Sequence, residues 1–380
     1  MFKNLKIKDY DFKLIFFVLC TNILGILIIG SAAPELQQKQ LLGSILGVFL
    51  MVVVSLFDYK IILRFYWLWY IIMVGLLLAV RIVGRSSHGS ARWFSIAGIT
   101  FQPSETAKII LIIFFAQFIM KYKDRINTVR FVVSYILLCG VPLGLTLLQP
   151  DLSTSIVIAT VFVILLFIAG ISWKFIVGAI ALLVPSVIIL FSMILKEGQS
   201  IIDDYQRQRI MAKIYPDKYA DDAYQQLNSE IAIGSGRLFG KGLNNNQIDS
   251  LKNGNYIIEP QNDFVFAVIG EELGFLGSLL VILLLFAIAI ECFMIARKIK
   301  EIDGRVIAIG MGSLVGIQGF FNIGVATNIL PNTGLPLPFV SYGLTSLVSL
   351  YIGIGFVLNV RLRNKPVRDK KELSFMGSSI

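Results

Sequence analysis

The segment Gln261–Gly277, QNDFVFAVIGEELGFLG, joins the largest polar stretch of the chain to a long apolar run. It carries Asp263, Glu271 and Glu272 at a predicted membrane edge, where carboxylates are costly to desolvate and therefore indicate a function. A carboxylate facing both lipid and water could act as a general base on a hydroxyl of a lipid-linked substrate. The structural alternative for Asp263 is an N-cap of a helix beginning at Phe264, and both roles can hold together.

Glu105 and Lys108 form a second ionisable pair, at the start of another apolar run. Their spacing of three places them on one helix face, where they can form an ion pair. Ionisable groups inside a membrane span usually face the interior of the helix bundle. Lys108 could therefore hold a phosphate or orient a carboxylate in a central cavity. Alternatively, the pair only fixes helix packing.

Two further charged residues lie in predicted outer loops. Arg92 precedes Trp93. An arginine guanidinium can donate two parallel hydrogen bonds to phosphate oxygens, so Arg92 could bind a pyrophosphate at the membrane interface. The alternative is an aromatic anchor with an arginine that reaches the headgroups. Asp151 follows Gln149-Pro150 and could face the same cavity as Asp263, or it could cap a helix at Leu152.

Basic side chains and glycines recur in the long polar stretch. Arg207 and Arg209 lie in the motif YQRQR, and Lys241 lies in the glycine-rich segment Ser229–Leu243. Glycine lets the backbone approach a ligand closely. The basic side chains of this stretch could then bind a pyrophosphate. The alternative is a solvated interfacial helix followed by a turn.

The segment from Pro331 to Pro338, PNTGLPLP, contains too many prolines for a regular helix. Irregular backbone at membrane depth is tolerated only where protein or a watery cavity covers it. Ser341 and Thr345 follow at the start of the last predicted span, so this segment predicts a cavity into which Ser341 could project.

The elements that must position these residues are membrane helices. The chain has 380 residues, of which 56% are hydrophobic and 15% charged, and its mean hydropathy is +0.78. No soluble domain has that much apolar surface, and the apolar runs are each long enough to cross a bilayer as a helix. The sequence predicts an all-α polytopic membrane protein with ten spans, roughly 14–32, 41–57, 65–83, 104–121, 130–148, 153–171, 175–195, 277–297, 305–325 and 341–360.

An even number of spans places both termini on one side of the membrane. The basic tail RLRNKPVRDKK and the basic loops on the same side predict that this side is the cytoplasm. Three polar segments then lie outside: Gly84–Pro103, the segment from Glu197 to Asn262, and Ala326–Val340. We therefore expect one integral membrane domain over residues 1–380, with a large outer loop at 197–262 within it.

Composition excludes several classes of site. Cys20, Cys139 and Cys292 all lie in apolar runs, which argues against a disulfide framework or a cysteine metal site. His88 is the only histidine, so a histidine zinc site or a histidine-dependent triad is nearly excluded. The chain has no P-loop and no dinucleotide fingerprint, so no organic cofactor is expected. The chain has a net charge of +10, and the distribution of its basic residues among the loops is that expected from membrane topology. We therefore expect no nucleic-acid partner.

Six ordered segments resemble one known family. They span residues 89 to 343 and are GSARWFSIAGITFQPSETAK, LLQPDLSTS, YQRQR, IAIGSGRLFGKG, EPQNDFVFAVIGEELGFLG and TGLPLPFVSYG. Together they resemble the SEDS family (shape, elongation, division and sporulation), and most closely its rod-shape branch, RodA. The chain departs from the family pattern at Arg237, Asn332, Leu344 and Thr345, but none of these positions is an ionisable match to the family.

The resemblance implies a peptidoglycan glycosyltransferase of the bacterial cytoplasmic membrane, with its active site on the outer face. Its members polymerise lipid II, the undecaprenyl-pyrophosphate-linked disaccharide pentapeptide, and work with a class B penicillin-binding protein. The family's essential aspartate falls on Asp263 and its cavity pair on Glu105 and Lys108. The outer-loop arginine of the family falls on Arg92, and its aspartate after Gln-Pro falls on Asp151.

These expectations describe an inverting transfer in which Asp263 takes the proton from the 4-hydroxyl of the acceptor N-acetylglucosamine. The leaving pyrophosphate would be neutralised by basic side chains and by a divalent cation, Mg²⁺ or Mn²⁺. Three alternatives stay open at this point: a lipid II flippase, a scaffold that recruits a transpeptidase, and a division or sporulation member of the same family. The nearly bare inner loops argue against a flippase, which needs gates on both faces.

Overall fold

The computed structural model describes residues 10–87, 90–96, 99–178, 181, 204–244 and 256–363. Within these residues, eight helices are long and apolar enough to cross a membrane: α1 (Phe12–Ala32), α2 (Pro34–Leu56), α4 (Tyr66–Val83), α5 (Pro103–Lys121), α6 (Val129–Leu147), α11 (Val265–Arg297), α12 (Ile302–Ala326) and α13 (Leu344–Arg363). A ninth apolar helix, α7 (Leu152–Ile168), is slightly shorter. Nine of the ten predicted spans thus correspond to helices, and the tenth, 175–195, lies almost entirely outside the described residues.

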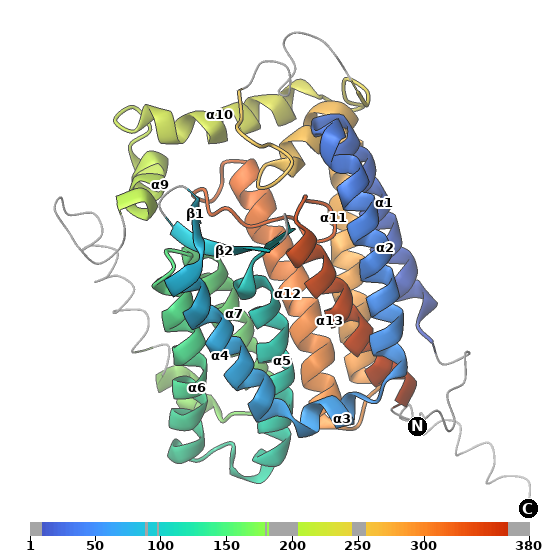
Figure 1. Cartoon of the computed structure of the whole chain (residues 1–380), viewed down its shortest axis with the longest axis vertical. Coiled ribbons are helices and arrows are strands. Elements are labelled where there is room, and N and C mark those ends of the chain that lie inside the picture. Colours follow the sequence, from blue (N-terminus) through green and yellow to red (C-terminus); the bar gives the residue numbers. More distant parts are fainter. Residues whose placement is uncertain are drawn as a thin grey trace, which may run out of the picture.

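The helices form a bundle whose centre is α5, α12 and α13 (Figure 1). In their most apolar stretches, 78% of the residues of α5 are buried, compared with 28% in α4 and α6 at the periphery. Helix α12 packs against α5, α7, α11 and α13. The site elements described below are therefore carried on the most enclosed helices of the molecule.

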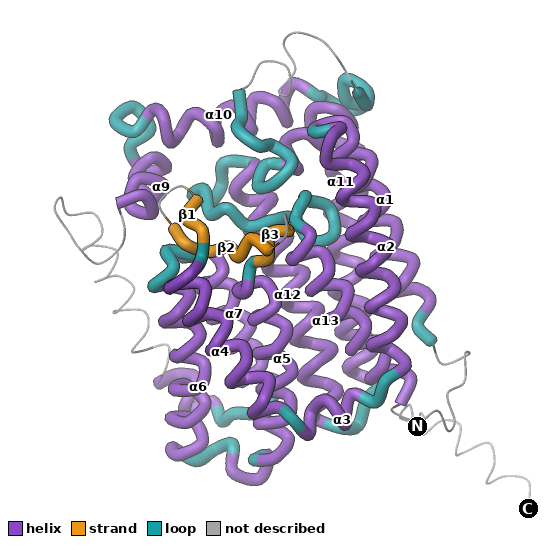
Figure 2. Tube along the Cα trace, in the orientation of Figure 1, coloured by secondary structure: helices purple, strands orange, loops and turns teal. Residues whose placement is uncertain are grey.

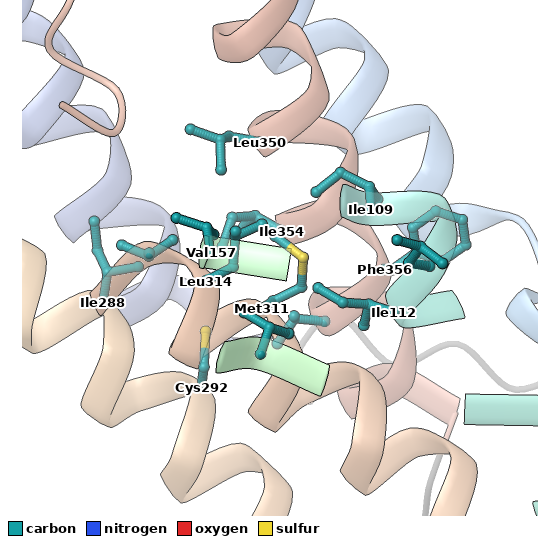
Figure 3. Close-up of a cluster of buried hydrophobic side chains, with 14 of the residues drawn as sticks. Ile109, Ile112, Val157, Ile288, Cys292, Met311, Leu314, Leu350, Ile354 and Phe356 are labelled. Carbon is teal, nitrogen blue, oxygen red and sulfur yellow. The ribbon is translucent and has the colours of Figure 1, made fainter. Parts of the chain in front are cut away.

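A continuous apolar core joins these helices at mid-depth. Figure 3 shows side chains of α5, α7, α11, α12 and α13 that converge there, with Met311 of α12 at the centre of the view. The labelled residues are Ile109, Ile112, Val157, Ile288, Cys292, Met311, Leu314, Leu350, Ile354 and Phe356. Because lipid tails are as apolar as these side chains, close packing is what fixes the helices in this arrangement.

Local sequence signals set several helix starts. The Asp11 carboxylate accepts a hydrogen bond from the backbone N–H of Leu14 at the start of α1, and Thr128 caps α6 in the same way through Phe131. Pro34 and Pro103 occupy the first positions of α2 and α5, where a missing N–H costs nothing.

The described ends of the chain lie at one end of the bundle (Figure 1). Helices α5, α11 and α13 finish there with basic residues in their last turns. Short elements complete this end: α3 (Tyr59–Arg64) and the 3-10 helix Lys123–Arg125. Tyr59 donates to Glu301 at 3.0 Å, and Arg363 pairs with Asp58 at 3.3 Å, so the first and last thirds of the chain are joined here. The arrangement agrees with an even number of spans and a basic inner face.

The three predicted outer segments meet at the opposite end of the bundle (Figure 2). The first contains a small antiparallel sheet that the sequence reading did not predict: β1 (Arg85–Ser87), β2 (Ser90–Ile96) and β3 (Ile99–Phe101), in the order β1-β2-β3. The second contains α9 (Asp204–Ile214) and α10 (Ala220–Ser235), and α10 packs on α11. The division into one domain with an outer loop at 197–262 stays a prediction.

Helix α11 is bent where a short helix meets the span. Gly274 has φ 67° and ψ −160°, which breaks the helix between a buried first part and the span that follows. The predicted span at 277–297 corresponds to the second part, and the expected helix start at Phe264 is within one residue of the observed start at Val265. The bend between the two parts was not predicted. The last span also begins later than predicted, at Leu344 rather than 341, because the proline-rich segment and a turn at Phe339 (φ 62°) precede it.

Candidate active site

Asp263 lies immediately before α11, at the end of the bundle where the three predicted outer segments meet. The helix begins at Val265 and its N-cap is Phe264, with no side-chain cap. The capping interpretation of Asp263 is therefore wrong, and its carboxylate is left for another role. The backbone carbonyl of Asp263 is held by Asn322 of α12, whose Nδ2 donates to it at 2.7 Å.

Charged side chains from four segments surround the Asp263 carboxylate. Burial raises its pKa above the ordinary value of 3.8. Arg209 of α9 is the main opposing influence and Arg92 of β2 adds to it, whereas the nearby charges of Glu259 and Asp151 raise the pKa further. A carboxylate with a raised pKa accepts a proton more readily than an ordinary one, which is the property a general base needs.

Gly334, in the segment between α12 and α13, adjoins both Asp263 and Arg209. A methyl group placed on Gly334 would lie 3.2 Å from Oδ2 of Asp263 and 3.3 Å from Nη1 of Arg209. Gly334 also has φ 73°, a conformation that favours glycine. The irregular segment predicted to cover a cavity thus passes directly beside the carboxylate.

Ser341 braces the loop that carries Asp263. Its Oγ donates to the backbone carbonyl of Asn262 at 2.6 Å and accepts from the backbone N–H of Leu337 at 2.7 Å. The next residue, Tyr342, donates its backbone N–H to Gln261 at 3.0 Å. The structure therefore brings Ser341 to the site, but its hydroxyl is engaged with backbone groups, which favours a structural role over the predicted substrate contact.

Asp151 caps α7 and is buried. Its Oδ1 accepts the backbone N–H of Thr154 at 3.1 Å, so the capping interpretation is confirmed here. Its Oδ2 is 3.4 Å from both the Oγ of Ser104 and the Nε2 of Gln102, which ties α7 to the start of α5. The charge of Asp151 also raises the pKa of Asp263, whereas a cavity shared by the two residues stays a prediction.

Arg92 supports the turn before α7. Its Nε donates to the carbonyl of Gln149 at 2.9 Å and its Nη2 donates to the carbonyl of Pro150. These contacts hold Asp151 in place from the direction of the sheet. Arg92 is half-buried and near enough to Asp263 to act on its carboxylate, so the structure brings together three residues that the sequence placed in different loops: Arg92, Asp151 and Asp263.

Glu105 and Lys108 form the predicted ion pair inside the bundle. The Nζ of Lys108 lies 2.7 Å from Oε1 of Glu105, and both side chains are almost fully buried. The ammonium also donates to Oε1 of Gln318 on α12 at 3.0 Å. Lys108 borders a small apolar cavity of about 20 Å³ between α5, α6, α7 and α12. The pair lies below the outer loops and reaches them through Gln318.

The glycine-rich segment after α10 packs against the bend in α11. Lys241 pairs with Glu271 at 2.7 Å, and the backbone N–H groups of Lys241 and Gly242 donate to the carbonyls of Glu271 and Glu272, both at 2.9 Å. Ser31 of α1 donates to the carboxylate of Glu272. Lys241 is thus placed in an ion pair away from the group around Asp263. Arg207 lies on α9 with Arg209 and is half-buried.

Three residues around the site were not singled out from the sequence: Asn322 and Gly334, which contact or adjoin Asp263, and Gln318, which joins Lys108 to the carbonyl of Pro336. Asn322 and Gln318 are polar residues in an otherwise apolar span, which is itself an indication of function that the sequence reading could have used. Gly334 lies inside the proline-rich segment that was identified as irregular. His88 and Gly89 lie outside the described residues.

The described residues do not form a metal centre of their own. Within them, no three His, Cys, Asp or Glu side chains are close enough to share an ion. The arrangement at Asp263 is a buried carboxylate flanked by a guanidinium, in a loop at the end of the bundle opposite the described chain ends (Figure 1). It can abstract a proton from a hydroxyl brought to that loop.

Known proteins share both the sequence and the fold. A family model described as "Cell cycle protein" and named for FtsW, RodA and SpoVE matches residues 12–366. The "Probable peptidoglycan glycosyltransferase FtsW" of Bacillus subtilis is 32% identical over 387 residues, covering 96% of this chain and 94% of that protein. The "Peptidoglycan glycosyltransferase MrdB" of Escherichia coli K12 is 33% identical over 363 residues, covering 93% and 94%.

Two solved structures have a similar fold. The rod shape determining protein RodA of Thermus thermophilus has a TM-score of 0.67 and 28% identity, with 93% of this chain and 96% of that chain covered. A structure described as "Structural coordination of polymerization and crosslinking by a peptidoglycan synthase complex" has a TM-score of 0.76 and 29% identity, with 93% and 97% covered.

Proposed function

Since the chain belongs to the SEDS family of cell cycle proteins, which includes FtsW, RodA and SpoVE, and is a peptidoglycan glycosyltransferase, we propose that it polymerises lipid II into glycan strands at the outer face of the bacterial cytoplasmic membrane. The observation that carries the proposal is Asp263: a carboxylate with a raised pKa that caps no helix and lies beside Arg209 at the outer end of the bundle. Basic residues in the last turns of α5, α11 and α13 support the assignment of the other end to the inner face.

The chemistry is an inverting glycosyl transfer. The Asp263 carboxylate takes the proton of the 4-hydroxyl of an acceptor N-acetylglucosamine as that oxygen attacks the anomeric carbon of the donor N-acetylmuramic acid. The bond from that carbon to undecaprenyl pyrophosphate breaks, and the pyrophosphate leaves with the bonding electrons. Base and leaving group lie on opposite faces of the sugar in such a reaction.

This geometry separates the roles of the basic residues. Arg209 adjoins the base, so we assign it to keeping the Asp263 carboxylate charged and directed at the acceptor hydroxyl. Arg92 and Arg207, which are half-buried near the same loops, are the candidates for the leaving pyrophosphate. Lys108 is buried against Glu105 and Gln318, so we assign it to the support of the site rather than to direct contact with substrate.

A divalent cation, Mg²⁺ or Mn²⁺, stays a prediction. The described residues supply no three-ligand centre for it, so no step above depends on one. Loss of polymerisation on thorough chelation, restored by the added ion, would support a cation, and unchanged activity would refute it.

We also propose a role in cell elongation with a class B penicillin-binding protein. The supports are the similarity to MrdB and to RodA, and the printed description of a neighbour as part of a complex that coordinates polymerisation with crosslinking. Binding of the purified chain to RodA-associated rather than FtsW-associated transpeptidases of its own organism would distinguish elongation from division.

Purified protein incubated with labelled lipid II tests the proposed activity. Ladders of glycan products from the wild type, with or without the transpeptidase and divalent ions, are the expected result. Transfer of lipid II between leaflets of a vesicle without any polymer would contradict the proposal and support a transporter.

A further inference from the structure

Asn322 joins the two backbone segments that meet at the active carboxylate. It lies on α12 and is only 1% exposed. Its Nδ2 donates to the carbonyl of Asp263 and to the carbonyl of Leu335, both at 2.7 Å. Leu335 follows Gly334, which adjoins the Asp263 carboxylate. One amide group thus fixes the base and the loop beside it relative to each other.

Gln318 repeats this arrangement one turn earlier on the same face of α12. Its Nε2 donates to the carbonyl of Pro336 at 3.0 Å, and its Oε1 accepts from Lys108 at 3.0 Å. Lys108 in turn pairs with Glu105 at 2.7 Å. A continuous series of hydrogen bonds therefore runs from the buried ion pair to Pro336, adjacent to the residue that Asn322 holds.

We propose that Asn322 is a positioning residue for Asp263, and that the Glu105–Lys108 pair supports the same loop through Gln318. This inference rests on the proposed function of Asp263. Irregular backbone inside a membrane protein has no water to satisfy its carbonyls, so the amides of α12 must do so. Because the two hydrogen bonds of Asn322 end on Asp263 and on Leu335, which follows Gly334, they set the position of the carboxylate as well as that of the loop.

Gln226 of α10 provides a matched control for a purely structural role. Its Nε2 donates to the carbonyls of Val325 and Leu330, at 3.1 and 2.5 Å, and its side chain is 3% exposed. Gln226 therefore holds the first part of the same α12–α13 connection with the same chemistry, but it makes no hydrogen bond to Asp263 or Leu335. Loss of loop stability alone should affect both positions alike.

The test compares Asn322→Leu with Gln226→Met in the full-length protein, using lipid II polymerisation and thermal unfolding. For Asn322→Leu we expect kcat per folded protein to fall about 10- to 100-fold, the range for misplacing a reacting group by up to 1 Å. KM should stay within about twofold, since ground-state binding is not what is lost. Gln226→Met should lower the unfolding temperature and leave kcat near the wild-type value.

The pH profile separates positioning from folding. The charged groups that face Asp263 are Arg209, Glu259, Arg92 and Asp151. If Asn322→Leu lets the carboxylate move away from Arg209, the acidic limb of kcat shifts to higher pH, because the group that most lowers its pKa is then more distant. An unshifted limb with a normal kcat would overturn the proposal, as would an equal loss of kcat in Gln226→Met.

Gln318→Met keeps the test valid if Asn322→Leu does not fold, because it removes one hydrogen bond to the loop instead of two. The proposal predicts that Gln318→Met lowers kcat less than Asn322→Leu does. It also predicts that adding Lys108→Met to Gln318→Met lowers kcat little further. Full additivity of the two substitutions would contradict the connection through Gln318. Absence of polymer from the wild type would refute the proposed function, whereas an active wild type with a normal Asn322→Leu refutes only this inference.

Discussion

Replacing Gly334 with alanine should impair catalysis more than folding. The added methyl would lie 3.2 Å from Oδ2 of Asp263 and 3.3 Å from Nη1 of Arg209, so these groups must move by a few tenths of an ångström. A misplacement of 1 Å costs about 100-fold in rate, so we expect kcat to fall about 5- to 10-fold. The left-handed backbone of Gly334, with φ 73°, adds about 1–2 kcal/mol of destabilisation.

Gly170 provides the matched control for backbone strain. It follows α7, has φ 87°, and a methyl placed on it would meet nothing within 4 Å. Gly170→Ala should therefore lose similar stability and keep its rate. Both variants would be compared by thermal unfolding in detergent and by initial rates of lipid II polymerisation per folded protein. Equal rates for the two variants would refute the argument that Gly334 makes room for the Asp263–Arg209 arrangement.

Three other predictions concern the charged groups. Glu105→Gln or Lys108→Met alone should destabilise the protein by about 3–5 kcal/mol, because each leaves a buried charge unpaired. In thermal unfolding, the double variant should be less destabilised than the worse of the two single variants. Polymerisation should require a deprotonated Asp263, so its rate should rise with pH through a midpoint above 3.8, and a midpoint at or below that value would contradict the assignment. Because the raised pKa means that the folded state holds this proton more tightly than the unfolded chain, the stability it contributes is present at low pH and lost as pH rises through the folded pKa. Asp263→Asn should accordingly raise the unfolding temperature at neutral pH, and an unchanged or lower temperature would show that the charged form is not destabilising.

The membrane architecture could be predicted because its causes are local. Apolar runs of bilayer length and the basic residues at their inner ends determine the spans and the side of the termini. The pairing of Glu105 with Lys108 and the cap at Asp151 also follow from spacing within one helix. Each of these needs only neighbours within a few positions of the chain.

The features that were missed have no clear signal in the local sequence. The sheet β1–β3 pairs short strands that carry no long alternating pattern. The bend at Gly274 is set by the packing of the segment around Gly240 against it, where an added methyl on Gly274 would meet the Gly240 backbone at 2.3 Å. The alternative role of Asp263 as a cap could not be rejected from the sequence, because aspartate before an apolar helix is often a cap, and only the structure shows that the helix begins at Val265 without a side-chain cap.

The most direct test of the account is the polymerisation rate of Asp263→Asn beside the wild type and Asp124→Asn, an acid-to-amide control in the exposed 3-10 helix at the opposite end of the bundle. The amide keeps the size and polarity of the side chain but cannot take the proton from the 4-hydroxyl of the acceptor sugar. The account predicts a folded Asp263→Asn protein that still binds lipid II and yields no glycan ladder, with normal ladders from Asp124→Asn. Ladders from Asp263→Asn at a rate near that of the wild type would contradict the assignment of Asp263 as the base.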